Sequence, residues 1–187
     1  MRSRRAPTRL LLFVCPLAVF QACNASGSAS LSGGVGRLEI QLTDAPIDLS
    51  NVSSVVVTIT DVLVYPGVEG MTGETAPPIV LTTHPQTFDL LTLTAGASAL
   101  LASGEVPAGF FQRIRLEISS ATLTNTDGTT ADLKIESGKV DVPIGFQLRA
   151  GGDATIVLDF DAAASVQVNQ TASDTLILRP VVTPKPI

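Results

Sequence analysis

The chain has 187 residues, of which 45% are hydrophobic and 16% are charged. This composition excludes a disordered polypeptide, and the length suits one domain with a substantial apolar core. Four of the twelve basic residues are arginines in the first nine positions, and all 17 acidic residues follow them. Without these four arginines, eight basic groups face 17 acidic ones, a net charge of −9. Because an acidic domain repels phosphates, we expect no nucleic-acid partner.

Residues 1–22 have the three parts of a secretion signal: a basic stretch, an apolar run over residues 10–20, and the small residue Ala22 before Cys23. The apolar run is shorter than the roughly 20 residues that a membrane-crossing helix needs. The segment LAVFQAC, residues 17–23, resembles the lipobox of bacterial lipoproteins. This resemblance implies that Cys23 is lipidated and becomes the new N-terminus. The alternative is ordinary cleavage near Ala22 and free secretion.

The two cysteines support the anchor, because Cys15 lies inside the apolar run and would leave with the signal. The mature chain then has no disulfide and no cysteine nucleophile. Residues 23–35, the predicted lipidated cysteine and a run rich in Gly, Ser and Ala, are expected to form a flexible tether. A coil of this length and composition has an end-to-end distance of about 20 Å.

Residues 36–42 alternate apolar and polar side chains, which predicts a strand with one buried face. The TDAPID segment, residues 43–48, predicts a turn begun by Asp44. Residues 52–65 predict a longer strand whose apolar positions are odd up to Ile59 and even from Val62. This change of phase at Thr60 and Asp61 predicts a β-bulge or a bend between two packed sheets.

Residues 66–78 are rich in Gly and Pro and predict an exposed loop. A short strand is expected at residues 79–81, and residues 87–93 suit either a strand or a short helical turn. After a further strand at residues 95–101, Pro107 and Gly109 predict a tight turn. The turn leads into a half-buried strand that extends to Ile118, with its arginines on the exposed face.

The remaining residues continue as short strands separated by turns. A hairpin is expected between residues 121–124 and 131–135, since an Asp-Gly pair lies between them. Further strands are predicted at residues 138–142, 144–148, 154–161 and 175–182, after which prolines prevent regular pairing. The pattern predicts an all-β fold, a single antiparallel β-sandwich of roughly seven to nine strands. The domain is expected to span residues 36–183, followed by a Pro-containing tail at 184–187.

Six segments of this chain resemble the bacterial lipoprotein family called domain of unknown function 4382. They occur in the family's order and are LTDAPID, VVVTITDVLV, FDLLTL, VPAGFFQRIRL, LDFDAAASV and LRPVV. The fourth segment also resembles a Pro-x-Gly-x-Tyr turn of transthyretin-like domains, with Phe111 in place of the tyrosine. The resemblance implies an envelope lipoprotein with a β-sandwich domain, and it implies no reaction, substrate or catalytic residue.

Few residues are candidates for chemistry. His84, the single histidine, precedes Pro85 in a predicted loop and lacks an evident nucleophile or orienting carboxylate. Carboxylates near strand ends could instead bind calcium, which takes six to eight oxygen ligands; these weak candidates are Asp44, Asp48, Asp159 and Asp161. The alternative is that Asp159 and Asp161 lie on the exposed face of a strand and that Asp44 and Asp48 form turns.

We therefore expect a lipoprotein of the bacterial cell envelope, held at the membrane through Cys23 and facing the periplasm or the cell surface. We expect a non-enzymatic binding or structural module with no cofactor, whose partner is an envelope protein or a glycan. The alternatives are a calcium-stabilised adhesion-type domain and a carbohydrate-binding module. Stacking on sugars would require Tyr65 and Phe110 to be exposed together. The loops near Asp44 and at residues 66–78 are the expected functional regions.

Overall fold

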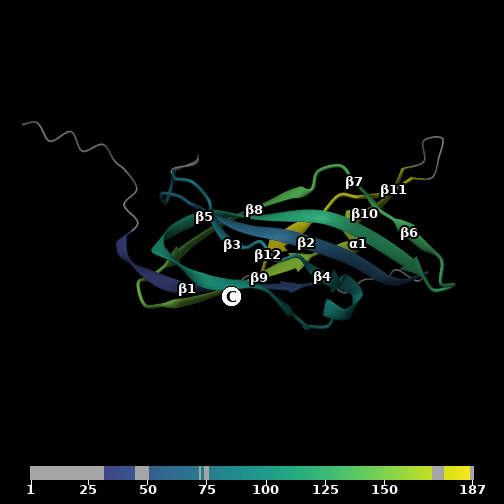
Figure 1. The fold of residues 1–187 in the computed structure, drawn as a ribbon, viewed down its shortest axis with the longest axis horizontal. Coiled ribbons are helices and arrows are strands. Elements are labelled where there is room, and N and C mark those ends of the chain that lie inside the picture. Colours follow the sequence, from purple (N-terminus) through teal and green to yellow (C-terminus); the bar gives the residue numbers. More distant parts are fainter. Residues whose placement is uncertain (1–31, 45–50, 72, 74–75, 170–174, 186–187) are drawn as a thin grey trace, which may run out of the picture.

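The computed structural model describes residues 32–44, 51–71, 73, 76–169 and 175–185. The regular structure in these residues is almost entirely β, which confirms the predicted all-β class (Figure 1). No helix among them is long and apolar enough to cross a membrane. The predicted signal, Cys23, most of the predicted tether and Asp48 lie outside the described residues.

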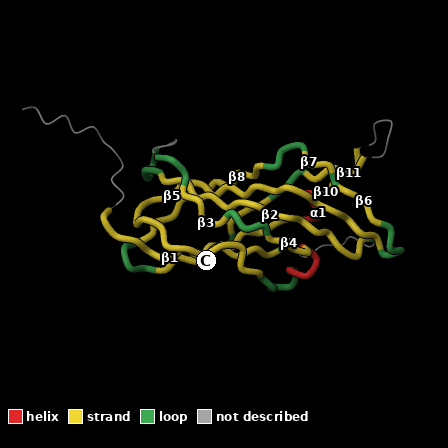
Figure 2. The backbone as a smooth tube through the Cα atoms, viewed as in Figure 1, coloured by secondary structure: helices red, strands yellow, loops and turns green. Residues whose placement is uncertain are grey.

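The strands fall into one large curled sheet and one small sheet. The large sheet contains β1 (Ser32–Thr43), β2 (Val52–Pro66), β3 (Ile79–Thr82), β4 (Gln86–Asp89), β5 (Ala99–Asn125), β6 (Thr130–Asp132), β8 (Lys139–Leu148), β9 (Asp153–Phe160) and β12 (Val182–Pro184). The small sheet contains β7 (Lys134–Ile135), β10 (Val166–Asn169) and β11 (Thr175–Leu178). Figure 2 shows how little helix accompanies them: a 3-10 turn, η1 (Leu90–Leu93), and a single α-helical turn, α1 (Ala162–Ser165).

The large sheet is built around β5, a strand of 27 residues. Its first part pairs antiparallel with β1, from Ala99 opposite Leu42 to Ala108 opposite Ser32. Its second part lies between β2 and β8 and is antiparallel to both. In Figure 1 the teal β5 ribbon runs along one layer, bends at one end of the molecule and returns in the other layer. The curled sheet therefore has a sandwich-like arrangement in which one strand belongs to both layers.

The predicted turn at Pro107 and Gly109 is wrong, because β5 continues through both residues. Pro107 lies opposite Val35 at an irregularity in the β1–β5 ladder, where a missing N–H group is tolerated. The partner of β5 changes from β1 to β8 immediately afterwards, between Ala108 and Gly109. The predicted strand at residues 95–101 is the beginning of the same strand. The proline and glycine thus mark a change of layer within β5.

Strands β1 and β2 follow the predicted alternation. The apolar side chains of β1 at Leu38, Ile40 and Leu42 are fully buried. In β2 the register shifts on both sides of Ile59, which confirms the predicted bulge. Because the bulge moves the buried face from odd to even positions, the apolar residues before and after it all reach the core. β1 begins at Ser32, so the last residues assigned to the tether, 32–35, are part of the strand.

The sheet is mixed rather than purely antiparallel, since β9 is parallel to β1 from Asp153 opposite Arg37 to Asp159 opposite Thr43. β12 then pairs antiparallel with the outer edge of β9. Buried side chains from both layers form one hydrophobic cluster. Apolar burial of this extent stabilises the described part of the chain, which contains no cysteine.

Three predicted strand boundaries are wrong. Residues 131–135 do not form one strand, because they are divided between β6 in the large sheet and β7 in the small one. Residues 138–142 and 144–148 form the single strand β8, because Pro143 lies opposite Arg113 where the β5–β8 ladder shifts register. Residues 175–182 do not form one strand: β11 belongs to the small sheet and β12 to the large one. Pro184, expected to prevent pairing, lies opposite Leu158 in the terminal strand.

The two ambiguous segments are also resolved. Residues 87–93 contain both predicted alternatives, since β4 ends at Asp89 and η1 follows at once. The hairpin between β5 and β6 is confirmed, with Thr124 opposite Thr130 and a turn that ends at Gly128, whose φ is 85°.

Many of the turns gather at two opposite ends of the large sheet (Figure 1). We call residues 32–37, 66–71, 106–110 and 145–153 the tether end, because the described chain enters there. We call residues 43–44, 89–94, 125–130 and 161–165 the far end.

Candidate functional site

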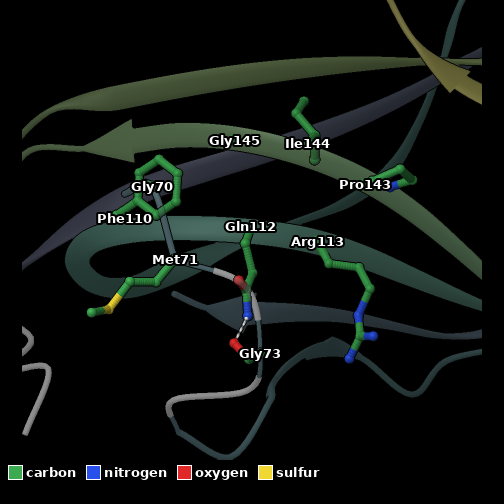
Figure 3. Close-up of a pocket in the computed structure, with 9 residues that line it drawn as sticks. All are labelled: Gly70, Met71, Gly73, Phe110, Gln112, Arg113, Pro143, Ile144 and Gly145. Atoms are coloured by element: carbon green, nitrogen blue, oxygen red, sulfur yellow. Dashed lines mark hydrogen bonds between the residues drawn. The ribbon is translucent and has the colours of Figure 1, made fainter. Parts of the chain in front are cut away.

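The tether end carries an open cavity of about 540 Å³ between the segment after β2 and the outer surface of β5 and β8 (Figure 3). Three separate segments line it: Gly70, Met71 and Gly73; Phe110, Gln112 and Arg113; and Pro143, Ile144 and Gly145. This lining is mostly apolar side chain and glycine backbone, with one amide and one guanidinium. Such a mixture of apolar surface and few polar groups is typical of binding sites.

Hydrogen bonds hold the segment after β2 against β5. The N–H group of Gly67 donates to the carbonyl of Phe110 at 2.9 Å. The Gln112 amide Nε2 donates to the carbonyl of Gly73, the bond drawn in Figure 3, and lies 3.5 Å from the Pro66 carbonyl. A Cβ atom at Gly67 would lie 2.9 Å from the Gln112 side chain, so this close approach requires glycine. Gln112 therefore positions one wall of the cavity.

Adjacent phenylalanines on β5 have different environments because side chains alternate along a strand. Phe111 is fully buried and stacks on Phe146, with ring centroids 5.1 Å apart. Phe110 is half-buried and faces the cavity, where a Cβ atom at Gly145 would lie 3.1 Å from its ring. The Phe110 ring thus covers a glycine of the neighbouring strand and forms an apolar wall.

A cluster of charged side chains lies beside the cavity, and two of them are arginines placed over an aromatic ring. The guanidinium carbon of Arg113 is 3.8 Å from the centroid of the Tyr65 ring, and that of Arg115 is 5.1 Å from it. Arg115 also donates two hydrogen bonds to Asp141, from Nε at 2.7 Å and from Nη2 at 2.8 Å. These bonds hold the pKa of the Asp141 carboxyl below its ordinary value and raise the pKa of Arg115. Arg115 and Asp141 therefore both remain charged at neutral pH, and their hydrogen bonds hold the two side chains together at the rim of the cavity.

Tyr65 is buried under these arginines, with only 4% of its surface exposed. Tyr65 and Phe110 are therefore not exposed together, which is the condition on which sugar stacking depends. Of the described residues that line the cavity, Met71 has a large apolar side chain that is exposed, at 65%.

The described acidic candidates lie at or near the far end, and each has a structural partner. Asp44 is buried, and its Oδ1 accepts a hydrogen bond from the Ala162 N–H group at 3.0 Å. Asp161 is the N-cap of α1, since its Oδ1 accepts from the Ala164 N–H group at 2.8 Å. Asp159 forms an ion pair with Lys185, with Oδ2 and Nζ 3.5 Å apart.

The structure thus brings Asp44 close to the residue after Asp161, while the fourth candidate, Asp48, is not described. Within the described ranges, no three His, Cys, Asp or Glu side chains are grouped so that they could hold a metal ion. The calcium hypothesis stays a prediction. His84 is exposed, and its backbone N–H group donates to the Thr82 hydroxyl at 3.1 Å.

The loop at residues 66–78, predicted to be functional, contributes Gly70, Met71 and Gly73 to the cavity, while Gln112 and the β8 residues of the lining were not predicted. The signal for Gln112 was its spacing of two from Phe110, which places both on one face of β5. No local signal could have found Pro143, Ile144 and Gly145, because their position depends on the register between β5 and β8.

The fold and the cavity together define a class: an all-β domain with an open, mostly apolar depression at one end of a curled sheet. Residues 35–180 match the protein family described as Domain of unknown function (DUF4382), and the chain belongs to that family. The search of curated proteins found no match. The search of solved structures also found none.

Proposed function

We propose that this chain is a lipid-anchored, non-enzymatic module of the bacterial cell envelope that binds a protein partner through the cavity at its tether end. The composition of that cavity carries the proposal. Its nine lining residues offer apolar contact and hydrogen-bonding groups. Among the lining residues that the structure describes, none is a Ser, Cys, His, Asp, Glu or Lys, the residue types that commonly act as nucleophiles or general bases.

The anchor rests on the sequence of the leader and on the position of Cys23. The basic stretch, short apolar run and LAVFQAC segment are those of a lipoprotein signal, and Cys23 precedes the first described strand by nine positions. A domain attached in this way stays close to the membrane, so a partner in the same envelope meets it at a high effective concentration.

Cell fractionation tests the anchor. The native chain is expected in the membrane fraction and to float with membranes in a density gradient, whereas the Cys23→Ser variant is expected in the soluble fraction. Ala22→Gly is a matched control, because it keeps a small residue before the cysteine and is expected to behave as the native chain. Equal partitioning of the native chain and Cys23→Ser would refute the anchor.

Photo-crosslinking tests the binding site. A photoreactive amino acid at Pro143, an exposed residue on the β8 wall of the cavity, is expected to give a discrete adduct with an envelope protein. The same amino acid at Asp127, in the far-end hairpin, is the control and is expected to give none. If Pro143 gives no adduct, or both positions give the same one, the cavity is not the partner site.

A thermal-shift series on the native chain addresses the two alternatives. Calcium should raise the midpoint, and EDTA should lower it, only if the protein is a calcium-stabilised domain. Members of a glycan panel should raise it only if the protein is a carbohydrate-binding module. The proposed protein-binding function predicts no shift with any of these additives.

A further inference from the structure

The tether end combines exposed apolar side chains with cations that form no salt bridge within the described part of the chain. Val35 and Met71 are 50% and 65% exposed, and both lie at this end. Arg37 and Arg149 are exposed, and neither forms a salt bridge with any residue of the described ranges. The described part of the chain thus presents exposed apolar side chains, and two guanidinium groups without a salt bridge there, on the side from which the tether leaves; Arg37 lies opposite Glu105 and Asp153 in the sheet.

Direct contacts place three of these groups around one turn, between β8 and β9. The Gly151 N–H group donates to the Val35 carbonyl at 2.7 Å, and the Arg37 N–H group donates to the Gly152 carbonyl at 2.9 Å. Arg149 belongs to the same turn, since its carbonyl accepts from Gly152 at 3.0 Å. Val35, Arg37 and Arg149 therefore form a single surface.

The cavity continues this surface. Phe110 lies opposite Gln147 in the β5–β8 ladder, two residues before Arg149 on β8. Met71 lies on the other side of Phe110 (Figure 3). We call the surface formed by Val35, Arg37, Met71, Phe110 and Arg149 the basal surface.

The length of the preceding chain limits where the basal surface can be. Nine positions separate Cys23 from Ser32, and even a fully extended chain of nine residues spans at most about 32 Å. With Cys23 lipidated, β1 begins within that distance of the lipid headgroups. The tether is therefore short enough for the basal surface to rest on the membrane, and in that orientation the far end is held away by the length of the sheet (Figure 1).

The charges of this end match a zwitterionic headgroup layer. Glu69, Glu105 and Asp153 are also exposed there, so the surface is mixed rather than basic. Phosphatidylethanolamine presents a phosphate and an ammonium group. Guanidinium groups pair well with phosphate, and carboxylates with ammonium. Exposed apolar side chains enter the boundary between headgroups and acyl chains.

We infer that the basal surface docks on the phosphatidylethanolamine headgroup layer of the membrane that holds the Cys23 lipid. Val35 and Met71 insert at the headgroup boundary, and Arg37 and Arg149 bind phosphates. This inference rests on the proposed lipid anchor. Docking fixes the orientation of the domain, with the β5–β6 hairpin directed away from the bilayer. It also places the cavity at the membrane surface, where it meets membrane-embedded partners.

Lipid-dependent quenching tests the docking on the full lipidated chain. The variants Met71→Cys and Asp127→Cys each provide a unique free thiol, because Cys15 leaves with the signal and the Cys23 thiol carries lipid. Each is labelled with a fluorophore and reconstituted into phosphatidylethanolamine vesicles with a minor fraction of phosphatidylglycerol and a spin-labelled lipid. We expect severalfold stronger quenching at position 71 than at position 127. Equal quenching at both positions, or none at either in protein that floats with the vesicles, would overturn the docking and leave the anchor intact.

Charge variants provide the second measurement. In the Met71→Cys background, replacing both Arg37 and Arg149 with Gln is expected to reduce quenching severalfold while the protein still floats. Lys134→Gln is the matched control, since Lys134 is exposed, has no salt bridge among the described residues, and lies on β7 away from the basal surface. An equal loss of quenching in the control would overturn the role of the two arginines. Failure of the native chain itself to float would instead refute the anchor.

Discussion

The two ends of the curled sheet use their polar side chains differently. At the far end, carboxylates accept hydrogen bonds from backbone N–H groups: Asp44 from Ala162, Asp89 from Leu91, and Asp161 from Ala164. At the tether end, the exposed Arg37 and Arg149 have no salt bridge within the described part of the chain. The far end therefore uses its charged groups to hold the fold, whereas the tether end presents its charged groups to solvent.

The largest expected effect on stability comes from truncating a core side chain of β5, the strand that runs between the two ends. Phe111→Ala removes a fully buried ring that stacks on Phe146, and it should lower the free energy of unfolding by about 3–5 kcal/mol. Phe110→Ala should cost clearly less, because that ring is half-buried against the cavity. Chemical denaturation of both variants measures the difference. Equal losses would contradict the assignment of the two rings to opposite faces of β5.

A second prediction concerns how the tether end is held. A Cβ atom at Gly36 would lie 2.6 Å from the Arg149 carbonyl oxygen and 2.8 Å from that of Gly152. Because backbone atoms must shift, Gly36→Ala should destabilise the chain by about 2–3 kcal/mol. Gly33→Ala is the matched control, since nothing lies within 4 Å of its added Cβ atom, and it should be nearly neutral. Thermal denaturation distinguishes the two, and equal midpoints would show that β1 does not pack on this turn.

Removing one charged group from each end shows how much each of these groups contributes to stability. Asp44→Ala leaves the buried Ala162 N–H group without its acceptor and should cost about 1–3 kcal/mol. Arg149→Gln should change stability by no more than about 0.5 kcal/mol, because its side chain is exposed and has no ion pair with any residue that the structure describes. Urea denaturation at neutral pH measures both changes. A larger loss for Arg149→Gln than for Asp44→Ala would reverse the comparison.

The smallest expected effect is a pH dependence of stability, which comes from the ion pair between Arg115 and Asp141 beside the cavity. The hydrogen bonds from Arg115 lower the folded-state pKa of Asp141 below its ordinary value of 3.8. The stabilisation is therefore complete above pH 3.8 and disappears as the pH falls through the lower folded-state pKa. The contribution should stay below about 1 kcal/mol, because the Asp141 side chain is 41% exposed. Asp141→Asn should flatten the loss of stability in acid, and an unchanged pH profile would contradict this account.

Much of the fold could be predicted because burial imposes a local period. Alternation in β1 and the change of phase at Thr60 and Asp61 were sufficient to predict two buried faces and a bulge. The continuity of β5 could not be predicted, because Pro107 is tolerated only where the β1–β5 ladder is irregular. The parallel pairing of β1 with β9 also depends on contacts between segments more than 100 positions apart.

The candidate site was less predictable than the fold. Its walls come from three segments that are distant in the sequence, and only the first, around Met71, was expected to be functional. The carboxylates that were predicted as possible metal ligands could also serve as caps and buried acceptors. Sequence alone does not separate these roles, because the same Asp residue types suit both.

The central claim is that Cys23 is the anchored N-terminus of the mature chain. Intact-mass analysis of the protein purified from membranes tests it most directly. The account predicts a mass that corresponds to residues 23–187 plus covalent acyl chains, and its disappearance from the membrane fraction in the Cys23→Ser variant. A soluble protein with an unmodified N-terminus would contradict the claim and, with it, the orientation inferred for the basal surface.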